Sequence, residues 1–303
     1  MKEHGNKKAV KGKRVMKDKT YISFDWALKR LLRDKANFGV LEGFLTTLLN
    51  QEIRIHRLLE SEGNKDREES KYNRVDILAE NGKKELVLVE VQGESEYAYF
   101  QRILFGASKL VTDYINFGDN YENVKKVYSI NIVYFDLGQG KDVVYHGKTE
   151  FRGIHENDVL TLSAFQKQKF GVTEVFQLYP EYYILKVNDF NRWSRVPLEQ
   201  WMYFLSTSDI PEDADAPGLQ EAREKMLFIH MDRNEQAAYR RYLDDRVVLA
   251  DQLYTARGEA KLEGRAEEKR EIARKLKMNG LSLDIIAKST GLAIEEIEEI
   301  EEV

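Results

Sequence analysis

The sequence has no cysteine, few histidines and no long apolar run, and each absence excludes a kind of site or protein. Without cysteine among its 303 residues the chain forms neither disulfide bonds nor thiolate metal sites, so any metal ion must be bound by oxygen or histidine. The five histidines show no spacing typical of metal ligands; they are His4, His56, His146, His155 and His230. No run of about eighteen apolar residues occurs, which predicts that the chain does not span a membrane.

Targeting signals and common phosphate-binding motifs are absent as well. The first twenty residues are basic but lack the apolar core of a signal peptide, so we expect a cytoplasmic protein. No glycine-rich phosphate loop follows a predicted strand, and no Gly-x-Ser-x-Gly motif occurs. The net charge of −5, from 47 basic and 52 acidic residues, neither indicates nor excludes nucleic-acid binding.

Apolar periodicity predicts an α/β domain. Helical spacing covers residues 24–50 and 96–115, while β-branched, alternating runs predict strands at 52–60, 72–80, 85–92 and 126–137. The order helix, three strands, helix, strand favours a mixed sheet. Further strands are expected within 142–154 and 180–190, and a helix begins at Pro197, which suits the first helical turn.

The character of the chain changes after this domain. We expect a basic flexible N-terminus at 1–20, a core at 21–208, a helical extension at 209–257, and a charged helix with a small helix-turn-helix-like tail at 258–303. Gly280 is expected to end the charged helix, and Ser282 to cap the next one.

Acidic and amide side chains interrupt the two runs of the segment YNRVDILAENGKKELVLVEVQGE, residues 72–94. Side chains alternate along a strand, so Asp76 shares a face with Leu78, while Glu90 and Gln92 share a face with Leu88. The opposite faces are apolar too, which predicts central strands in which an unpaired carboxylate is costly. Either a divalent cation or an ion pair with Arg74 or Lys71 would compensate that cost.

The turn of this hairpin decides whether the two acids can meet. Directly opposed residues share a face, so Asp76 and Glu90 require a loop of three or five residues in an unbulged hairpin. A two-residue turn at Asn81-Gly82 would set Asp76 opposite Val87 and away from Glu90.

The same residues carry a resemblance to a known family. Asp76, followed by Glu90-Val91-Gln92, resembles the metal-binding signature of the PD-(D/E)XK nuclease superfamily, in the Glu-x-Gln form of its Rpn group of recombination-promoting nucleases or putative transposases. The match continues from about Tyr21 through an ordered series of segments: FDWALKRLL, YFQRILFGASKLVTDYI, KKVYSINIVYFDLG, PEYYILKVNDF and GLSLDIIAKSTGLAIEEIEEI. It implies a restriction-endonuclease-like α/β fold, with a mixed sheet flanked by helices and an α-helical C-terminal extension.

The resemblance also implies an activity and its site. Asp76 and Glu90 would bind Mg²⁺, with Mn²⁺ as a substitute, and Val91 would offer its carbonyl. The reaction would be DNA endonuclease cleavage linked to recombination or transposition, with DNA as the partner. Gln92 stands where much of the superfamily has lysine, and an amide cannot supply the positive charge of lysine. The alternative is a catalytically weak or inactive nuclease fold that acts as a DNA-binding or assembly scaffold.

Three further residues are candidates for the site. Superfamily members often add an acid from the first helix, and Glu42 is the candidate here, the alternative being the solvated face of an amphipathic helix. Lys29 lies one helical turn from Asp25, which suits an intrahelical ion pair or a substrate contact. Arg102, on the helix after the signature, is a candidate for a phosphate contact.

The C-terminal tail has the outline of a DNA-binding helix-turn-helix but the wrong charge. Its second helix carries six glutamates in the last nine residues of the chain, which would repel the DNA phosphates. Its apolar residues instead predict a small packing unit; they are Ile285, Ile286, Leu292, Ile294 and Ile297. We therefore expect the C-terminal helices to mediate homo-oligomerisation while the core, and the basic N-terminus with it, meets DNA.

Overall fold

A computed structural model describes residues 21–30, 32, 34–59, 76–115, 118–188 and 190–301, without the side chains of Lys29 and Ile229. The chain divides into two compact units, Met1–Asp232 and Arg233–Val303. Among the described residues, no helix is long and apolar enough to cross a membrane.

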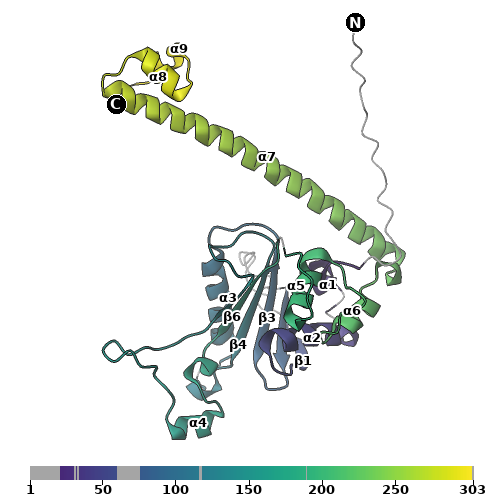
Figure 1. Ribbon diagram of the computed structural model, residues 1–303. Helices are drawn as coiled ribbons and strands as arrows, with labels where there is room; N and C mark the ends of the chain where they lie inside the picture. Colours follow the sequence, from purple (N-terminus) through teal and green to yellow (C-terminus); the bar gives the residue numbers. More distant parts are fainter. Residues whose placement is uncertain are drawn as a thin grey trace. The chain divides into compact units, whose positions relative to one another are not determined.

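The first unit is built around a mixed sheet (Figure 1). Its strands are β1 (Ile55–Leu59), β2 (Ile77–Asn81), β3 (Leu86–Gln92), β4 (Val127–Val133), β5 (Val144–Gly147) and β6 (Glu181–Lys186). In the part of the chain that the structure describes they form one six-stranded sheet in the order β1-β2-β3-β4-β6-β5. The β3–β4 and β4–β6 pairs are parallel and the other pairs antiparallel, so the expected mixed sheet is confirmed.

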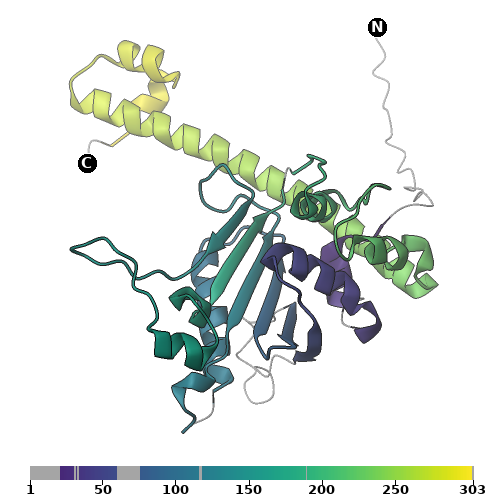
Figure 2. The same ribbon diagram turned by 60° about the horizontal axis from the view of Figure 1, so that its bottom comes forward.

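Helices cover both faces of the sheet (Figures 1 and 2). The helices of this unit are α1 (Phe24–Arg30), α2 (Phe38–Leu49), α3 (Tyr99–Asp113), α4 (Ala164–Phe170), α5 (Pro197–Thr207) and α6 (Leu219–Lys225). The 3-10 turns are η1 (Lys35–Asn37), η2 (Tyr121–Asn123), η3 (Val175–Leu178) and η4 (Phe228–His230). Residues 24–50 thus form two helices, and Pro197 begins α5 as its sequence position predicts.

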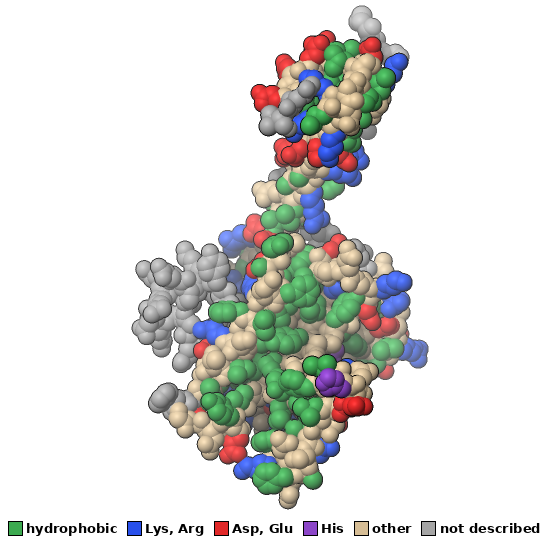
Figure 3. Space-filling model, turned by 90° about the vertical axis from the view of Figure 1, so that its left-hand side faces the viewer, with side chains coloured by type: hydrophobic (Ala, Val, Ile, Leu, Met, Phe, Trp, Pro, Cys, Tyr) green, Lys and Arg blue, Asp and Glu red, His purple; other side chains and the backbone are tan. Residues whose placement is uncertain are grey.

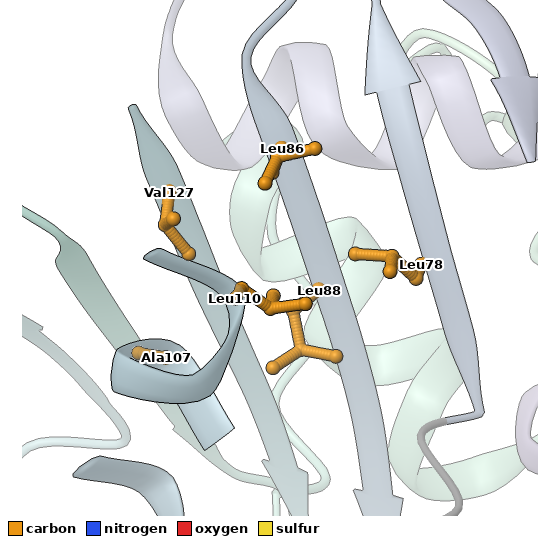
Figure 4. Packing of buried hydrophobic residues seen from close by; sticks show 6 residues of the cluster. All are labelled: Leu78, Leu86, Leu88, Ala107, Leu110 and Val127. Carbon is orange, nitrogen blue, oxygen red and sulfur yellow. The ribbon is translucent and has the colours of Figure 1, made fainter. Parts of the chain in front are cut away.

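The side of the sheet covered by α3 contains a compact apolar cluster. Leu78, Leu86, Leu88 and Val127 are buried there, and Figure 4 shows them around Ala107 and Leu110 of α3. Burial of aliphatic side chains between helix and sheet stabilises the fold by roughly 1.5–3 kcal/mol per side chain. Asp76 and Glu90 belong by alternation to this same face.

Aromatic residues fill the opposite side of the sheet, under α1, α2 and α5. Phe24 lies edge-on to Phe44 with ring centroids 5.4 Å apart, and Trp201 lies 5.3 Å from Phe44. Phe24, Phe44, Trp201 and Phe204 are all fully buried. This packing fixes α1, α2 and α5 against one another.

The outer side of α3 is apolar although it faces solvent. Phe100, Leu104 and Phe105 are 54%, 57% and 59% exposed. Figure 3, which views the side of the molecule where α3 lies, shows hydrophobic side chains gathered across that surface. The helix therefore buries one apolar face and leaves a second one uncovered in the isolated chain.

The hairpin between β2 and β3 closes with a three-residue loop. Ile77 pairs with Val89 and Glu80 with Leu86, and the backbone N–H of Asn81 donates to the Glu85 carbonyl at 3.0 Å. Lys84 is in the left-handed region with φ 62°, as the last residue of such a loop requires. The side-chain oxygen of Asn81 accepts hydrogen bonds from the N–H groups of Lys83 and Glu85. The prediction of an odd loop length is confirmed.

The segment after α5 packs as part of the first unit. Gly43 of α2 lies so close to Gly218 that a Cβ on Gly43 would be 2.4 Å from the Gly218 backbone, which only glycine tolerates. The Gln200 side chain holds the same segment by accepting from the N–H groups of Asp215 and Ala216. Residues 209–232 thus differ from the separate extension expected to begin at 209, because α6 buries its apolar side on α2.

The second unit contains α7 (Arg233–Met278), α8 (Leu283–Thr290) and α9 (Ile294–Glu298). Gly280, with φ 74°, follows the end of α7 as expected, whereas Ser282 occupies the cap position of α8 without a side-chain cap bond. Ile286 and Ile297 are buried with Ala273 and Ile300, and Leu292 packs on them, which confirms the packing unit. The prediction was wrong for Ile285 and Ile294, which are exposed because they lie on the outer sides of α8 and α9.

We expect Glu80→Gln to destabilise the protein at neutral pH by about 1–3 kcal/mol, because Glu80 is buried and paired with two cations. A hydrogen bond from Lys125 lowers the pKa of Glu80 below its ordinary value of 4.5, and Arg57 adds to this effect. The difference in unfolding free energy between wild type and Glu80→Gln should be largest above that pH and should shrink as the pH falls below it. Denaturant unfolding at neutral pH and at about pH 3.5 measures this; a difference independent of pH would contradict it.

Candidate metal centre

The hairpin register brings Asp76 and Glu90 together, and we call them the acidic pair. Asp76 directly precedes Ile77, and Ile77 pairs with Val89, so Asp76 stands opposite Glu90 on the side of the sheet that α3 covers. A side-chain oxygen of Asp76 accepts a hydrogen bond of 2.7 Å from the backbone N–H of Val91. Both acids therefore lie at one end of the two central strands.

Glu90 is a buried carboxylate without a direct partner among the residues that the structure describes. Its residue is 6% exposed, and it makes no hydrogen bond or ion pair within the described part of the chain. Burial raises the pKa of the Glu90 carboxyl; the positive charge of Arg102 opposes this rise, and the negative charges of Asp76 and Glu96 add to it. An ionised carboxylate in this position needs a cation, because its desolvation is uncompensated.

Glu80 provides a contrast within the same hairpin face. It is as buried as Glu90, but its oxygens pair with Lys125 Nζ at 2.5 Å and Arg57 Nε at 3.3 Å. The fold thus supplies two cations to the acid at the turn end of the hairpin. Lys71 and Arg74, the alternative partners expected for the acidic pair, lie outside the residues that the structure describes.

Val91 and Gln92 continue β3 past Glu90. The N–H of Val91 points toward Asp76, and in an antiparallel ladder the carbonyl of the same residue points to the same side. Gln92 follows on the face of Glu90, and its Nε2 donates to the carbonyl of Glu94 at 3.2 Å. Gln92 therefore holds the loop after β3 through this hydrogen bond. Its amide carries no charge.

The loop after β3 and the first turn of α3 add three polar side chains near the acidic pair. Arg102 donates from Nη1 to Glu96 at 2.8 Å. The Tyr99 hydroxyl is buried and has no hydrogen-bond partner among the described residues. Burial raises the pKa of Tyr99, and the charge of Glu90 raises it further. Glu96 and Tyr99 were missed from sequence, although the spacing Glu96-x-x-Tyr99-x-x-Arg102 places all three on one side of a helix start.

The structure does not bring Glu42 to the acidic pair. One Glu42 oxygen accepts from the N–H of Ile55 at 2.7 Å and the other pairs with Arg54 at 3.2 Å. Ile55 pairs with Asn81, at the turn end of β2, about 17 Å along the strand from Asp76. The placement of Glu42 beside a shared site is corrected, because this acid satisfies the first amide of β1 at the other end of the sheet.

Lys29 and Asp25 lie on α1. Asp25 is half-buried on that helix, and the side chain of Lys29 is among those the structure leaves undescribed. Their expected ion pair, and a substrate contact by Lys29, stay predictions.

Few groups at this site are available as metal ligands, and all of them are hard oxygen donors. Among the described residues no group of three or more His, Asp or Glu side chains is arranged to hold a metal ion. Two carboxylates and a backbone carbonyl remain, with Glu90 lacking any other cation contact. This oxygen set fits Mg²⁺, which keeps several water ligands and typically takes one or two carboxylates.

Comparison with known protein families agrees with the mixed sheet and with the paired acids on its central strands. The family model described as PD-(D/E)XK nuclease family transposase matches residues 22–252. The chain belongs to this family, in agreement with the resemblance seen in its signature. Comparisons with curated proteins and with solved structures give no match.

We expect Glu90→Gln to stabilise the protein in the presence of a chelator by about 1–3 kcal/mol, the opposite sign to Glu80→Gln. The amide keeps the shape of the side chain and removes a buried charge that has no partner among the described residues. Denaturant unfolding at neutral pH measures the change. Destabilisation by Glu90→Gln similar to that by Glu80→Gln would show that a cation already compensates Glu90.

Proposed function

We propose that this protein is a magnesium-dependent DNA endonuclease that acts in DNA recombination or transposition. The observation that carries the proposal is Glu90, a buried carboxylate that faces Asp76 and has no cation partner among the described residues. Family membership supports DNA as the substrate class, since the family is described as a PD-(D/E)XK nuclease family transposase.

In this proposal Asp76 and Glu90 hold the metal ion, and Val91 offers its carbonyl from the same strand end. When bound, the ion would polarise a phosphoryl oxygen and supply an activated water for attack on the phosphodiester. Asp76 is oriented for this role because the hydrogen bond from the Val91 N–H fixes its carboxylate. Mn²⁺ would substitute for Mg²⁺, because both take oxygen ligands in octahedral geometry.

The proposal predicts metal binding and cleavage that depend on the same two acids. Wild type should gain thermal stability with Mg²⁺ or Mn²⁺ and should nick supercoiled plasmid, because the ion binds the folded protein only. Asp76→Ala and Glu90→Ala should lose both properties. Thermal shift titration and agarose-gel cleavage measure them, with Glu150→Gln, at an exposed loop acid, as the control.

Two other outcomes separate the alternatives. Metal binding without cleavage would favour the catalytically inactive scaffold, for which the uncharged Gln92 is the supporting observation. Equal cleavage by wild type and Glu90→Ala would overturn the site.

We further propose that copies of the chain pair through α7. Leu243, Val247, Ala250 and Tyr254 recur at spacings of four, three and four residues, the spacing of a coiled-coil seam. Val247 and Tyr254 are 63% and 80% exposed, so these two positions of the stripe are uncovered by the described residues. A second copy offers a matching stripe, because the seam is self-complementary.

Light scattering tests this pairing. The double substitution Val247→Glu and Tyr254→Glu should reduce the mass to that of one chain, because it brings like charges together in the seam. Val248→Glu, on the other side of the same helix, should leave the mass unchanged. DNA affinity should change little in either variant. A wild type of monomer mass, or equal effects of both variants, would contradict the assignment.

A further inference from the structure

The proposed reaction requires a fixed positive charge near the phosphate, and no side chain of β3 supplies it. Attack on a phosphodiester concentrates negative charge on the phosphoryl oxygens, and fixed positive charge stabilises it. The residue two positions after Glu90 is Gln92, whose Nε2 binds the Glu94 carbonyl. A cation from another element would have to take the place of the strand lysine.

Arg102 is the cation that α3 turns toward this end of the sheet. Its charge acts on Glu90, where it opposes the effect of burial on the carboxyl pKa. Its guanidinium carbon lies 6.0 Å from the centre of the Tyr99 ring, which limits the orientations of the side chain. No other arginine or lysine within the described residues is a main influence on Glu90.

The hydrogen bonds of Arg102 leave one edge of its guanidinium unused. Nη1 donates to Glu96 at 2.8 Å, whereas Nε is buried with no acceptor, and Nη2 has none among the described residues either. The Nε and Nη2 donors lie side by side and form the bidentate edge that fits two oxygens of a phosphate. A buried N–H without an acceptor is unfavourable, so a phosphate oxygen that reaches this edge would relieve an unsatisfied donor.

We propose that Arg102 is a catalytic residue that binds the scissile phosphate through Nε and Nη2 in place of the missing strand lysine, and that Glu96 is the positioning residue that holds it. The inference rests on the proposed nuclease function. Glu96 fixes Nη1 from the loop after β3, so the free edge keeps one direction. The guanidinium of Arg102 lies over the face of the Tyr99 ring, which limits its movement.

The first test compares metal binding with cleavage in Arg102→Gln. Cleavage should fall roughly 10²–10³-fold, the usual effect of removing one charge-stabilising donor. Mn²⁺ affinity should stay the same or rise roughly 3- to 10-fold, because a positive charge near the acidic pair is gone. A purely structural role would weaken both together. Arg152→Gln, at another arginine paired with a glutamate, is the matched control and should change neither.

A second test restores the charge from the strand. Gln92→Lys in the Arg102→Gln background should recover at least a tenth of wild-type cleavage, because lysine would then supply the charge from β3. Each tenfold change in rate corresponds to about 1.4 kcal/mol of activation free energy. Arg102→Lys should retain intermediate activity, since it keeps the charge without the bidentate edge. Absence of rescue, or full activity of Arg102→Gln, would overturn the proposal.

DNA affinity in the absence of metal ions gives a readout that does not require cleavage. Arg102→Gln should weaken binding to a short duplex and reduce the slope of log affinity against log salt by about one phosphate contact, unlike Arg152→Gln. Unchanged affinity and slope would overturn the phosphate contact even if wild type proved inactive. If wild type bound no metal ion, the proposed function would be refuted instead. Failure of the phosphate contact and failure of the proposed function are therefore distinguishable.

Discussion

The register between β2 and β3 is the constraint on which the rest of this structure depends. A three-residue loop, fixed by the Asn81 side chain and the left-handed Lys84, sets Ile77 opposite Val89. Because side chains alternate along strands, a shift by one residue would send Asp76 to the opposite face. The same shift would remove Leu78 from the cluster under α3, so packing and site share one geometric requirement.

The two buried glutamates of the hairpin differ in their charge partners, and this difference distinguishes a structural acid from a candidate functional one. Glu80 receives Lys125 and Arg57, so its charge is compensated within the fold. Among the described residues, Glu90 receives the electrostatic attraction of Arg102 and the repulsion of Asp76 and Glu96, and no direct ion pair. A fold selected for stability alone would pair or remove such an acid. The uncompensated carboxylate is therefore a stability cost that a bound cation would offset.

Helix α3 connects the core to the acidic pair. Ala107 and Leu110 anchor it on the sheet, while its first turn carries Tyr99 and Arg102, both of which interact electrostatically with Glu90. The loop from Gln92 to Glu96 is short and internally bonded, so the position of Arg102 follows from the end of β3. The polar groups thus lie on rigid elements, which favours a defined geometry for charge stabilisation.

The sequence by itself determined the mixed α/β fold, the odd hairpin loop and the family, because alternation, turn chemistry and an ordered series of segments are local properties. It also indicated Asp76 and Glu90, since acids in strands that are apolar on both faces stand out. Only the tertiary structure decided the fate of Glu42, which binds the first amide of β1 at the far end of the sheet. It also revealed Glu96 and Tyr99 and placed residues 209–232 in the first unit. These depend on which elements pack together, and helical periodicity gives the face of a helix but not the strand end that it meets.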